Sequence, residues 1–217
     1  MSQTAAITRL QSLPAIFRGA DLTTRFGWTS KTASHYLYLW KRRRLVAGLG
    51  GHSDVFANLL MTHATAGPDW EAALRAAMPS AVVMGVEALR RAGWTTQVPA
   101  RTGVAVDAAQ AVYKTPYFDL ALRRAGWFAC IRAGCVIAAG ALPVLKPAWA
   151  LADLLQNADW GDLGLWPDDI EWSALTPQDS ETWQAARTAF GMPPADLWAA
   201  SKMATSHRNP PPGWSGR

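Results

Sequence analysis

The sequence predicts an α+β fold, with a small helical module at the amino terminus and a larger mixed α/β domain after it. Three observations predict it. The first third holds amphipathic helical segments followed by two strand-like segments with glycines between them. It also carries nearly all the surplus positive charge. The remainder alternates helical stripes with short apolar runs, and 217 residues, half of them hydrophobic, fit one large domain or two small ones.

The module begins with three expected helices. Residues 4–13 and 19–26 have apolar side chains at helical spacing. Gly27 is a natural left-handed end for the second helix. Thr29 or Ser30 can cap the third helix by accepting a hydrogen bond from a free N–H in its first turn. The short turn between the second and third helices has the length found in a helix-turn-helix.

The third helix has two contrasting faces when its residues are placed at helical intervals. Its expected core face consists of Ala33, Tyr36, Leu37 and Trp40. Its expected outward face consists of Lys31, His35, Tyr38 and Arg42, flanked by Thr32, Ser34 and Lys41. The outward face offers hydrogen-bond donors, acceptors and positive charge but no acid, which a helix needs in order to read base edges between phosphates.

A hairpin is expected after the third helix. Residues 45–48 and 55–59 are typical of short strands, and "LGGHSD" between them supplies glycines and small polar residues for a tight reversal. Three helices followed by such a hairpin predict a winged helix-turn-helix over residues 1–66. A mixed α/β domain is expected over 67–205, and a disordered proline- and glycine-rich tail over 206–217.

The charge distribution favours a polyanionic partner for the module. Residues 1–65 hold eight Lys or Arg against two acids, a net charge of +6, whereas the rest holds 13 basic and 14 acidic residues, a net charge of −1. A one-sided positive field of this kind is typical of proteins that bind nucleic acid. Double-stranded DNA is therefore the expected partner.

The expected DNA contacts fall into three groups. The base-reading group on the third helix is Lys31, Thr32, Ser34, His35 and Tyr38, with His35 and Tyr38 preferred. The phosphate group is Lys41, Arg42, Arg43 and Arg44, with Arg18 and Arg25 as weaker candidates. The hairpin group is Gly51, His52 and Ser53, while Asp54 should point away or brace the turn.

Simpler alternatives stand beside each of these assignments. The third helix could present an ordinary solvated face. The "KRRR" run could be a nuclear import signal or a solubilising helix end, and its charge also stabilises the helix dipole. The glycine-rich segment could be a plain hairpin turn.

The second domain is less regular in sequence. Helices are expected over residues 68–77, 80–92, 148–155, 180–190 and 194–203. "TTQV" and "VAV" are expected to pair as a hairpin, and "WFACI" and "CVIAAG" to be buried strands, although short apolar runs are ambiguous between strand and helix. Cys130 and Cys135 lie in those two runs, so we expect inert, reduced core thiols. Twelve tryptophans indicate thick packing layers.

Membrane insertion and catalysis are not expected. The longest apolar run, residues 133–145, is shorter than the roughly 20 residues that cross a bilayer, and the start lacks a signal-peptide pattern, so a cytoplasmic location is expected. The four histidines lack metal-site spacing. Asp168, Asp169 and Glu171 could hold a divalent ion, but a solvated acidic loop is the favoured interpretation. We therefore predict no metal, no cofactor and no enzyme activity.

The order of elements resembles the AbiEi family of bacterial transcriptional regulators, antitoxins of type IV toxin–antitoxin systems. The resemblance rests on "LQSLPAIFRGADLTTRFGWTSKTASHYLYLWKRRRLV", "AVVMGVEALRRAGW" and "PVLKPAWALADLL", within residues 4–155. It implies a repressor that binds inverted repeats in its own promoter and opposes a nucleotidyltransferase-like toxin without a stable complex.

This chain departs from the family pattern at three places. Arg44 stands where the family usually has Gly before the first strand of the hairpin, and Phe56 stands where Tyr is common. Ala148 and Trp149 replace a charged pair after a later proline. The first departure adds positive charge where phosphates would lie.

The expected function is sequence-specific DNA binding by an autoregulating antitoxin. One alternative is a winged-helix regulator of other genes, whose second domain binds a small molecule or a protein. The other is a nucleic-acid enzyme that uses the winged helix for docking.

Overall fold

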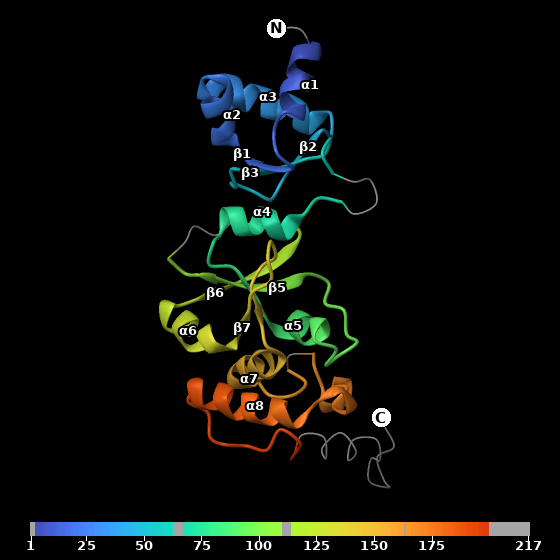
Figure 1. The fold of residues 1–217 in the computed structure, drawn as a ribbon, viewed down its shortest axis with the longest axis vertical. Helices are drawn as coiled ribbons and strands as arrows, with labels where there is room; N and C mark the ends of the chain where they lie inside the picture. The colour runs from blue at the N-terminus through green and yellow to red at the C-terminus, as the bar shows by residue number, and fades with distance from the viewer. Residues whose placement is uncertain (1–2, 63–66, 110–113, 163, 200–217) are drawn as a thin grey trace, which may run out of the picture. The chain divides into compact units, whose positions relative to one another are not determined.

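The computed structural model describes residues 3–62, 67–109, 114–162 and 164–199, and its fold is mixed α+β (Figure 1). The chain divides into two compact units. The first comprises the described parts of Met1–Ala81, together with Ala108–Asp119 and Ala138–Leu142. The second comprises the described parts of Val82–Asp107, Leu120–Ile137 and Pro143–Arg217.

The first unit contains four described helices and a three-stranded sheet. The helices are α1 (Gln3–Gln11), α2 (Gly19–Phe26), α3 (Ser30–Arg42) and α4 (Trp70–Ala77). The strands are β1 (Ile16–Arg18), β2 (Val46–Gly48) and β3 (Val55–Asn58). All of these elements except β1 match segments expected from the sequence.

The predicted ends of α2 and α3 are confirmed. Gly27 follows α2 with a φ of 63°, and its N–H donates to the Thr23 carbonyl at 3.0 Å. The backbone needs a left-handed residue here, which glycine adopts without steric cost. Thr29 precedes α3, and its Oγ1 accepts a hydrogen bond from the Thr32 N–H at 3.2 Å. This cap satisfies one of the N–H groups that the first turn leaves without a helical partner.

The three strands pair antiparallel in the order β1-β3-β2. Strand β1 was not expected, because three residues are too few to show a period-two pattern. It pairs Phe17 with Phe56 across β3, and the two rings lie 5.7 Å apart. Strand β1, which lies between α1 and α2 in the chain, therefore forms one edge of the sheet.

The core of the first unit forms where the helices meet this sheet. Its buried side chains include Leu10, Leu13, Phe17, Leu22, Trp28, Ala33, Trp40, Val46 and Phe56. The predicted core face of α3 is confirmed, since Ala33 and Trp40 are buried while Tyr36 and Leu37 pack partly buried against them. Trp28 stacks on Tyr36 with ring centres 4.6 Å apart.

A buried polar group joins α1 to the sheet. Asn58 at the end of β3 is fully buried, and its Nδ2 donates to the carbonyls of Leu10 at 2.8 Å and Leu13 at 3.2 Å. Its own N–H donates to the Ala15 carbonyl at 2.7 Å. These bonds satisfy a polar group that would otherwise be costly to bury.

The first unit continues beyond the boundary expected at residue 66. Helix α4 packs against β3 and β1, and Arg18 donates a hydrogen bond to the Ala76 carbonyl in its last turn. Trp70 of α4 stacks on Tyr117, with ring centres 3.8 Å apart and ring planes at 15°. The apolar stripe of α4 is thus buried within this unit, with Ala73 and Leu74 fully covered.

The second unit combines four α-helices, three short 3₁₀ turns and a five-stranded sheet among its described residues. The helices are α5 (Gly85–Arg91), α6 (Ala125–Cys130), α7 (Pro147–Asn157) and α8 (Pro177–Ala189), and the turns are η1 (Ile131–Gly134), η2 (Pro167–Asp169) and η3 (Trp172–Ala174). The strands are β4 (Val82–Val83), β5 (Thr102–Asp107), β6 (Phe118–Arg123), β7 (Cys135–Val136) and β8 (Val144–Leu145). Their order is β6-β5-β4-β8-β7, with β4 and β8 parallel.

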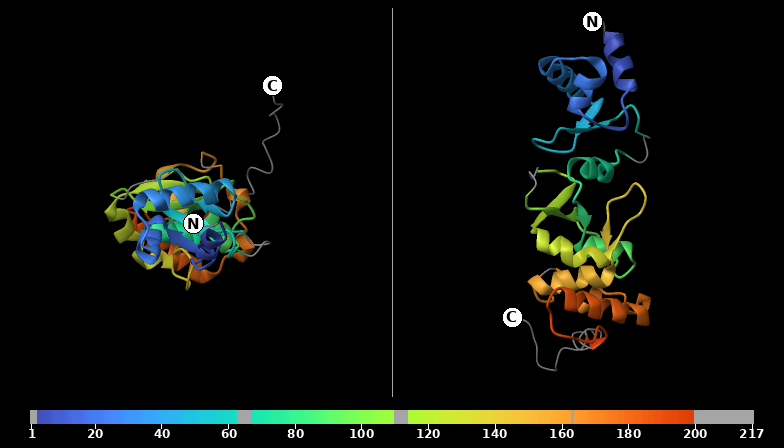
Figure 2. Two further views of the ribbon diagram at one scale, coloured as in Figure 1. Left: turned by 90° about the horizontal axis from the view of Figure 1, so that it is seen from above. Right: turned by 60° about the vertical axis from the view of Figure 1, so that its left-hand side comes forward.

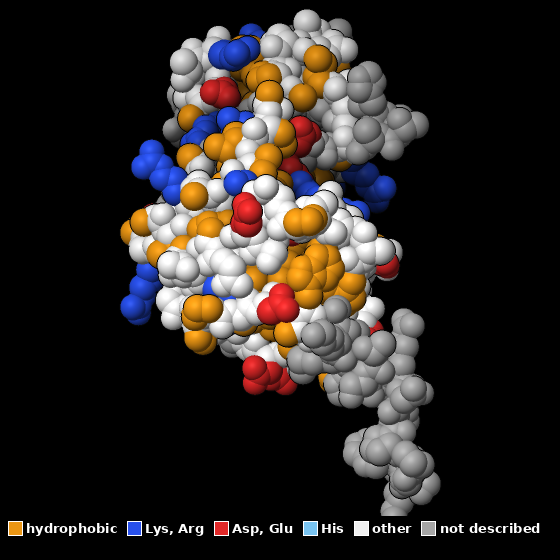
Figure 3. Space-filling view, turned by 60° about the horizontal axis from the view of Figure 1, so that its bottom comes forward, with side chains coloured by type: hydrophobic (Ala, Val, Ile, Leu, Met, Phe, Trp, Pro, Cys, Tyr) orange, Lys and Arg blue, Asp and Glu red, His pale blue; other side chains and the backbone are white. Residues whose placement is uncertain are grey.

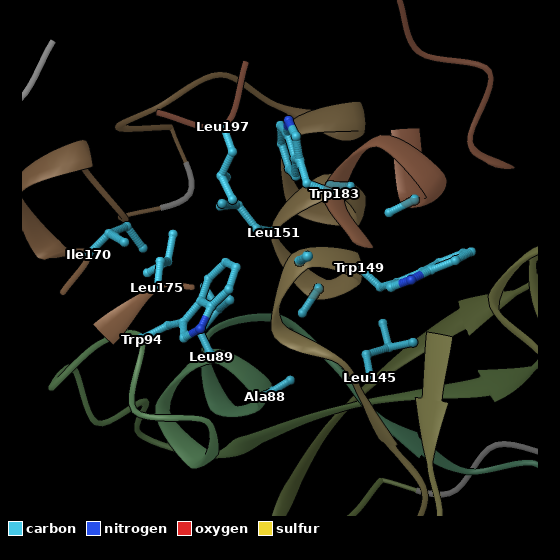
Figure 4. Close-up of a cluster of buried hydrophobic side chains, with 14 of the residues drawn as sticks. Ala88, Leu89, Trp94, Leu145, Trp149, Leu151, Ile170, Leu175, Trp183 and Leu197 are labelled. Carbon is cyan, nitrogen blue, oxygen red and sulfur yellow. The ribbon is translucent and has the colours of Figure 1, made fainter. Parts of the chain in front are cut away.

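Helix α7 lies at the centre of the second unit's core. It packs against α5 and α8, and the ribbon views show α8 running beside it (Figures 1 and 2). Because α7 is covered on both sides, Ala148–Ala152 are all buried. Figure 4 shows Trp149 on this helix and Trp94 and Trp183 beside it, together with aliphatic side chains from α5 and the loops that follow α7.

Several expectations for the second unit are wrong. The segment 80–92 begins as strand β4, and α5 starts only at Gly85, whose φ is 64°. "WFACI" falls mainly in helix α6, which leaves Cys130 exposed and not in the core. Cys135 is half-buried in β7, and burial raises the pKa of its thiol. The expected strand "TTQV" is not a strand. The expected tail over 206–217 lies outside the described residues.

None of the described helices is long and apolar enough to cross a membrane. The surface still carries scattered apolar side chains, visible as separate orange areas on the face drawn in Figure 3. The large exposed ones are Tyr38, Leu60, Met61, Val98, Leu122, Val136, Ile137 and Trp166.

Candidate nucleic-acid interface

Helix α3 presents a polar, cationic face away from the first unit's core. Its exposed side chains are Lys31, Ser34, His35, Tyr38, Lys41 and Arg42. Tyr38 is 57% exposed, which is unusual for a ring of that size. The helix contains no acid, and its Lys and Arg side chains lie at its two ends, with Lys31 at the start and Lys41 and Arg42 in the last turn. It can donate and accept hydrogen bonds and can attract an anionic partner.

Thr32 differs from its neighbours on this face. Its side chain is half-buried, and its Oγ1 lies 2.9 Å from the Oγ1 of Thr29. The two hydroxyls therefore hydrogen-bond to one another at the capped start of α3. The Thr32 hydroxyl therefore stabilises the start of the helix. It could bind a ligand only through the hydrogen-bonding capacity that this contact leaves free.

Two cations at the end of α3, Lys41 and Arg42, contact different aromatic rings. The Lys41 Nζ lies 4.6 Å from the centre of the Phe56 ring on β3, so this cation rests on the sheet. The Arg42 guanidinium lies 5.8 Å from the Tyr38 ring, one helical turn back on the outward face. Both geometries are favourable cation–π contacts, worth about 0.5–1 kcal/mol at exposed sites.

Arg43 and Arg44 form the turn that leads from α3 into β2. The Arg44 N–H donates to the Lys41 carbonyl at 3.0 Å, and Arg44 has a φ of 55°. It is the one non-glycine residue in the described chain with a positive φ. An L-residue pays roughly 1–2 kcal/mol for this left-handed backbone. Glycine would adopt this backbone conformation without strain, but the chain has an exposed arginine at the position.

The β2–β3 turn, residues 49–54, is only partly available to a ligand. Gly51 and His52 are exposed as expected. Ser53, also expected in the hairpin group, is instead buried, and its Oγ accepts the Val55 N–H at 3.1 Å. Ser53 thus braces the turn from inside.

Asp54 also braces the turn and binds it to α2. Its carbonyl accepts the Gly19 N–H at 2.9 Å, and its carboxylate accepts the Ala20 N–H at 3.4 Å. A side chain at Gly19 would collide with this carboxylate. The negative charge lies at the amino end of α2, where the helix dipole favours it.

The two weaker phosphate candidates are already engaged within the protein. Arg18 donates to the Ala76 carbonyl at the end of α4. The Arg25 Nη1 donates to the Ser12 carbonyl at 3.5 Å, close to the limit of a hydrogen bond. Both side chains remain exposed, but Arg18 in particular is oriented by a structural contact.

A hollow of about 290 Å³ lies between α2 and α3. Thr23, Ser30 and Ser34 contribute hydroxyl groups to its lining, and Asp54 contributes a carboxylate. The hydroxyls can bind a phosphate oxygen, whereas the carboxylate would repel it. The hollow continues the outward face of α3 at Ser34.

Sequence reasoning missed one residue beside this surface. The Gly51 N–H donates to the Lys114 carbonyl at 3.0 Å, so an exposed lysine from much later in the chain lies next to the β2–β3 turn. No local pattern in the sequence signals this contact.

The titratable clusters of the second unit form structural ion pairs. Asp153 is buried, and its carboxylate accepts the Trp127 Nε1–H at 2.7 Å and an Arg123 N–H at 2.9 Å. Burial raises the pKa of Asp153, and the contacts with Trp127 and Arg123 oppose that rise. Glu87 is also buried and pairs with Arg90 and Arg91.

The acidic segment considered as a metal site is a capped turn. The Asp169 carboxylate accepts the Trp166 N–H at 2.7 Å. Within the described residues, no group of three or more His, Cys, Asp or Glu side chains is placed to hold a metal ion.

Similarity to known proteins is found among solved structures. No family model matches the chain, and no curated protein matches it. Among solved structures, the chain is similar to the crystal structure of the RV2827C protein from Mycobacterium tuberculosis, with 16% sequence identity and a TM-score of 0.47. That similarity covers 95% of this chain and 80% of the other.

Proposed function

We propose that the chain binds double-stranded DNA in a sequence-specific manner, with α3 as the recognition helix of a winged helix-turn-helix. The observation that carries the proposal is the division of α3 into two faces. Ala33 and Trp40 fix the helix in the core, while Lys31, His35 and Tyr38 are exposed on a face that contains no acid. A rigid helix with such a face can enter a major groove and contact base edges.

The order of the elements supports the winged-helix assignment. The first unit runs α1, β1, α2, α3, β2 and β3, with β2 and β3 paired as a hairpin directly after α3. A three-residue link containing Gly27 joins α2 to α3. In this arrangement the hairpin flanks the recognition helix and can contact the DNA backbone beside the groove.

The side chains of the interface divide into two roles. Ser34, His35 and Tyr38 would contact base edges, and Lys31 would contact a base or a phosphate at the start of the helix. Lys41, Arg42, Arg43 and Arg44 would bind phosphates, as would the exposed part of the β2–β3 turn. Arg42 is also close enough to Tyr38 to orient that ring.

We further propose that the chain is a transcriptional repressor acting on its own promoter, as the antitoxin of a type IV toxin–antitoxin system. This part rests on the resemblance to the AbiEi family. It requires the protein to bind inverted repeats, because two copies related by a two-fold axis read two half-sites of opposite direction.

Footprinting of the purified chain on the DNA upstream of its gene tests both parts. Protected inverted repeats are the expected result. Protection without repeats would contradict the repressor model of paired half-sites, and the absence of any protected region would contradict specific DNA binding.

The salt dependence of binding tests the phosphate assignment. Each phosphate contact contributes about −0.9 to the slope of the logarithm of the binding constant against the logarithm of salt concentration. Replacing Arg42, Arg43 and Arg44 by alanine should reduce the slope by up to about 2.7 and weaken binding to all sequences alike. Alanine at the exposed Arg124 and Arg132 of the second unit is the matched control and should leave the slope unchanged.

A further inference from the structure

The β2–β3 turn contains no positive charge of its own. Its residues are Leu49, Gly50, Gly51, His52, Ser53 and Asp54. Its one acidic side chain is that of Asp54, whose carboxylate accepts a hydrogen bond at the start of α2, and it contains no Lys or Arg. A cation close to the turn would strengthen its contact with phosphates, because a Lys or Arg side chain that neutralises a phosphate releases counterions from the DNA. The sequence of the turn does not provide one.

A segment from later in the chain lies directly against this turn. Residues 114–117, here called the bracket, belong to the same compact unit as the turn. The Gly51 N–H donates to the carbonyl of Lys114 at 3.0 Å. Gly50 approaches even more closely, because a Cβ there would collide with the Lys114 carbonyl oxygen and lie 2.9 Å from the Thr115 Cα. The main chains of turn and bracket are therefore in direct contact.

The bracket is held firmly on its other side. Thr115 is buried, and its Oγ1 accepts the Tyr117 N–H at 3.2 Å. The Tyr117 ring stacks on Trp70 of α4, and α4 packs on β3. The turn, the bracket, α4 and β3 thus form a closed loop of contacts, which fixes the position of Lys114 relative to the hairpin.

We propose that the bracket positions the β2–β3 turn and that Lys114 is a further phosphate-binding residue of the interface. The inference rests on the proposed DNA binding. The Lys114 side chain is exposed, while its carbonyl is tied to Gly51, next to the exposed His52. Lys114 supplies the positive charge that the turn lacks, and Gly50 is the residue that permits the two main chains to meet.

The charge of Lys114 is tested with Lys114→Gln, which keeps the length and polarity of the side chain. Binding to the upstream duplex and to an unrelated duplex of equal length is measured over a range of salt concentrations. Loss of one phosphate contact should reduce the slope by about 0.9 and weaken both complexes roughly three- to tenfold at physiological salt. Arg132→Gln in the second unit is the matched control and should change neither value.

The positioning role is tested by adding a methyl group at Gly50 and, as a control, at a glycine outside the interface. Gly50→Ala should displace the bracket and reduce the slope by at least the contribution of Lys114, whereas Gly126→Ala in the second unit should leave the slope unchanged, because a Cβ at Gly126 meets no atom within 4 Å. Circular dichroism and thermal unfolding establish that each variant is folded. If Gly50→Ala fails to fold, Lys114→Gln decides the inference alone.

The outcomes separate this inference from the proposed function. A wild-type chain that binds no duplex overturns both. If the wild type binds with a steep salt dependence and Lys114→Gln keeps the full slope, Lys114 is not a phosphate contact and only the inference is overturned. If a folded Gly50→Ala binds DNA with the same salt slope as Gly126→Ala and the wild type, the bracket does not position the turn.

Discussion

The ammonium group of Lys41 lies 4.6 Å from the centre of the Phe56 ring, and this contact joins the last turn of α3 to strand β3. Helix α3 and the hairpin beside it are therefore connected by a side chain that the proposed function also assigns to phosphate binding. The proposal therefore gives this lysine a role in stability and a role in binding, and the two contributions can be measured separately.

Replacing Lys41 by methionine keeps an unbranched apolar side chain on the ring but removes the charge. We expect the free energy of unfolding to fall by about 0.5–1 kcal/mol, and the salt slope of DNA binding to fall by about 0.9. Urea unfolding and titrations at several salt concentrations measure the two effects. Lys31→Met at the exposed start of α3 is the control and should change binding but not stability. Equal stability losses in both variants would contradict the contact with Phe56.

Replacing Arg44 by glycine should raise the stability of the chain and lower its affinity for DNA. The φ of 55° is strained for arginine and relaxed for glycine, so the free energy of unfolding should rise by roughly 1 kcal/mol. DNA affinity should fall, because one phosphate contact is lost. Arg43→Gly is the control: Arg43 has a φ of −88°, so glycine relieves no strain there and should not stabilise the chain. A gain in stability in both variants would contradict the strain at Arg44.

Replacing Thr29 by alanine removes the cap of the recognition helix. The Thr32 N–H then loses its acceptor, and we expect the free energy of unfolding to fall by about 0.5–2 kcal/mol. Thr29→Ser keeps the hydroxyl and should retain most of that stability. Thermal unfolding followed by circular dichroism makes the comparison, and equal losses in the two variants would show that the methyl group matters more than the cap.

The two buried carboxylates of the second unit should give pH dependences of opposite sign. Hydrogen bonds from Arg90 lower the pKa of Glu87 from its usual value of 4.5, so its stabilising contribution is present above that pH and is lost as the pH falls through the lowered pKa. Burial raises the pKa of Asp153 from its usual value of 3.8, so its ionisation makes unfolding easier as the pH rises from 3.8 through the raised pKa.

Unfolding free energies measured from pH 3 to 7 test this contrast. The stability difference between wild type and Glu87→Gln should increase with pH, and the difference between wild type and Asp153→Asn should decrease with pH. Two differences that change in the same direction would contradict one of the two assigned shifts.

The two cysteines should differ in reactivity. Cys130 is exposed, whereas Cys135 is half-buried and burial raises the pKa of its thiol. Because the thiolate is the reactive form, a thiol reagent at neutral pH should modify Cys130 first and Cys135 more slowly. Mass spectrometry at timed intervals follows both, and Cys130→Ser should remove the fast phase. A slow single phase in the wild type would mean that Cys130 is protected.

Signals confined to one helical turn were predictable from the sequence. The bounds of α2, the left-handed Gly27 and the Thr29 cap depend on residues within a few positions of one another, and all were expected. The two faces of α3 were also expected, since a period of 3.6 residues sorts them without any knowledge of the rest of the chain.

Elements that depend on distant partners were not predictable. Strand β1 is recognisable only from its pairing with β3, and β4 only from its neighbours β5 and β8. The apolar run around Cys130 was expected to be a strand and is a helix, because an apolar run of that length fits both.

The same division applies to the candidate interface. The exposure of Lys31, His35 and Tyr38 followed from periodicity. The burial of Ser53, the engagement of Arg18 with α4 and the proximity of Lys114 to the turn arise from contacts between residues remote in sequence. No local pattern carries that information.

The buried amide of Asn58 determines how far the first unit can be shortened. Removing residues up to Leu13 would take away both carbonyl acceptors of its Nδ2 and leave an unsatisfied donor inside a hydrophobic environment. A fragment that retains α2, α3 and the hairpin but lacks α1 should therefore be less stable than the whole first unit. We therefore expect that a fragment of the first unit folds only when it includes α1, although this helix carries none of the proposed contacts.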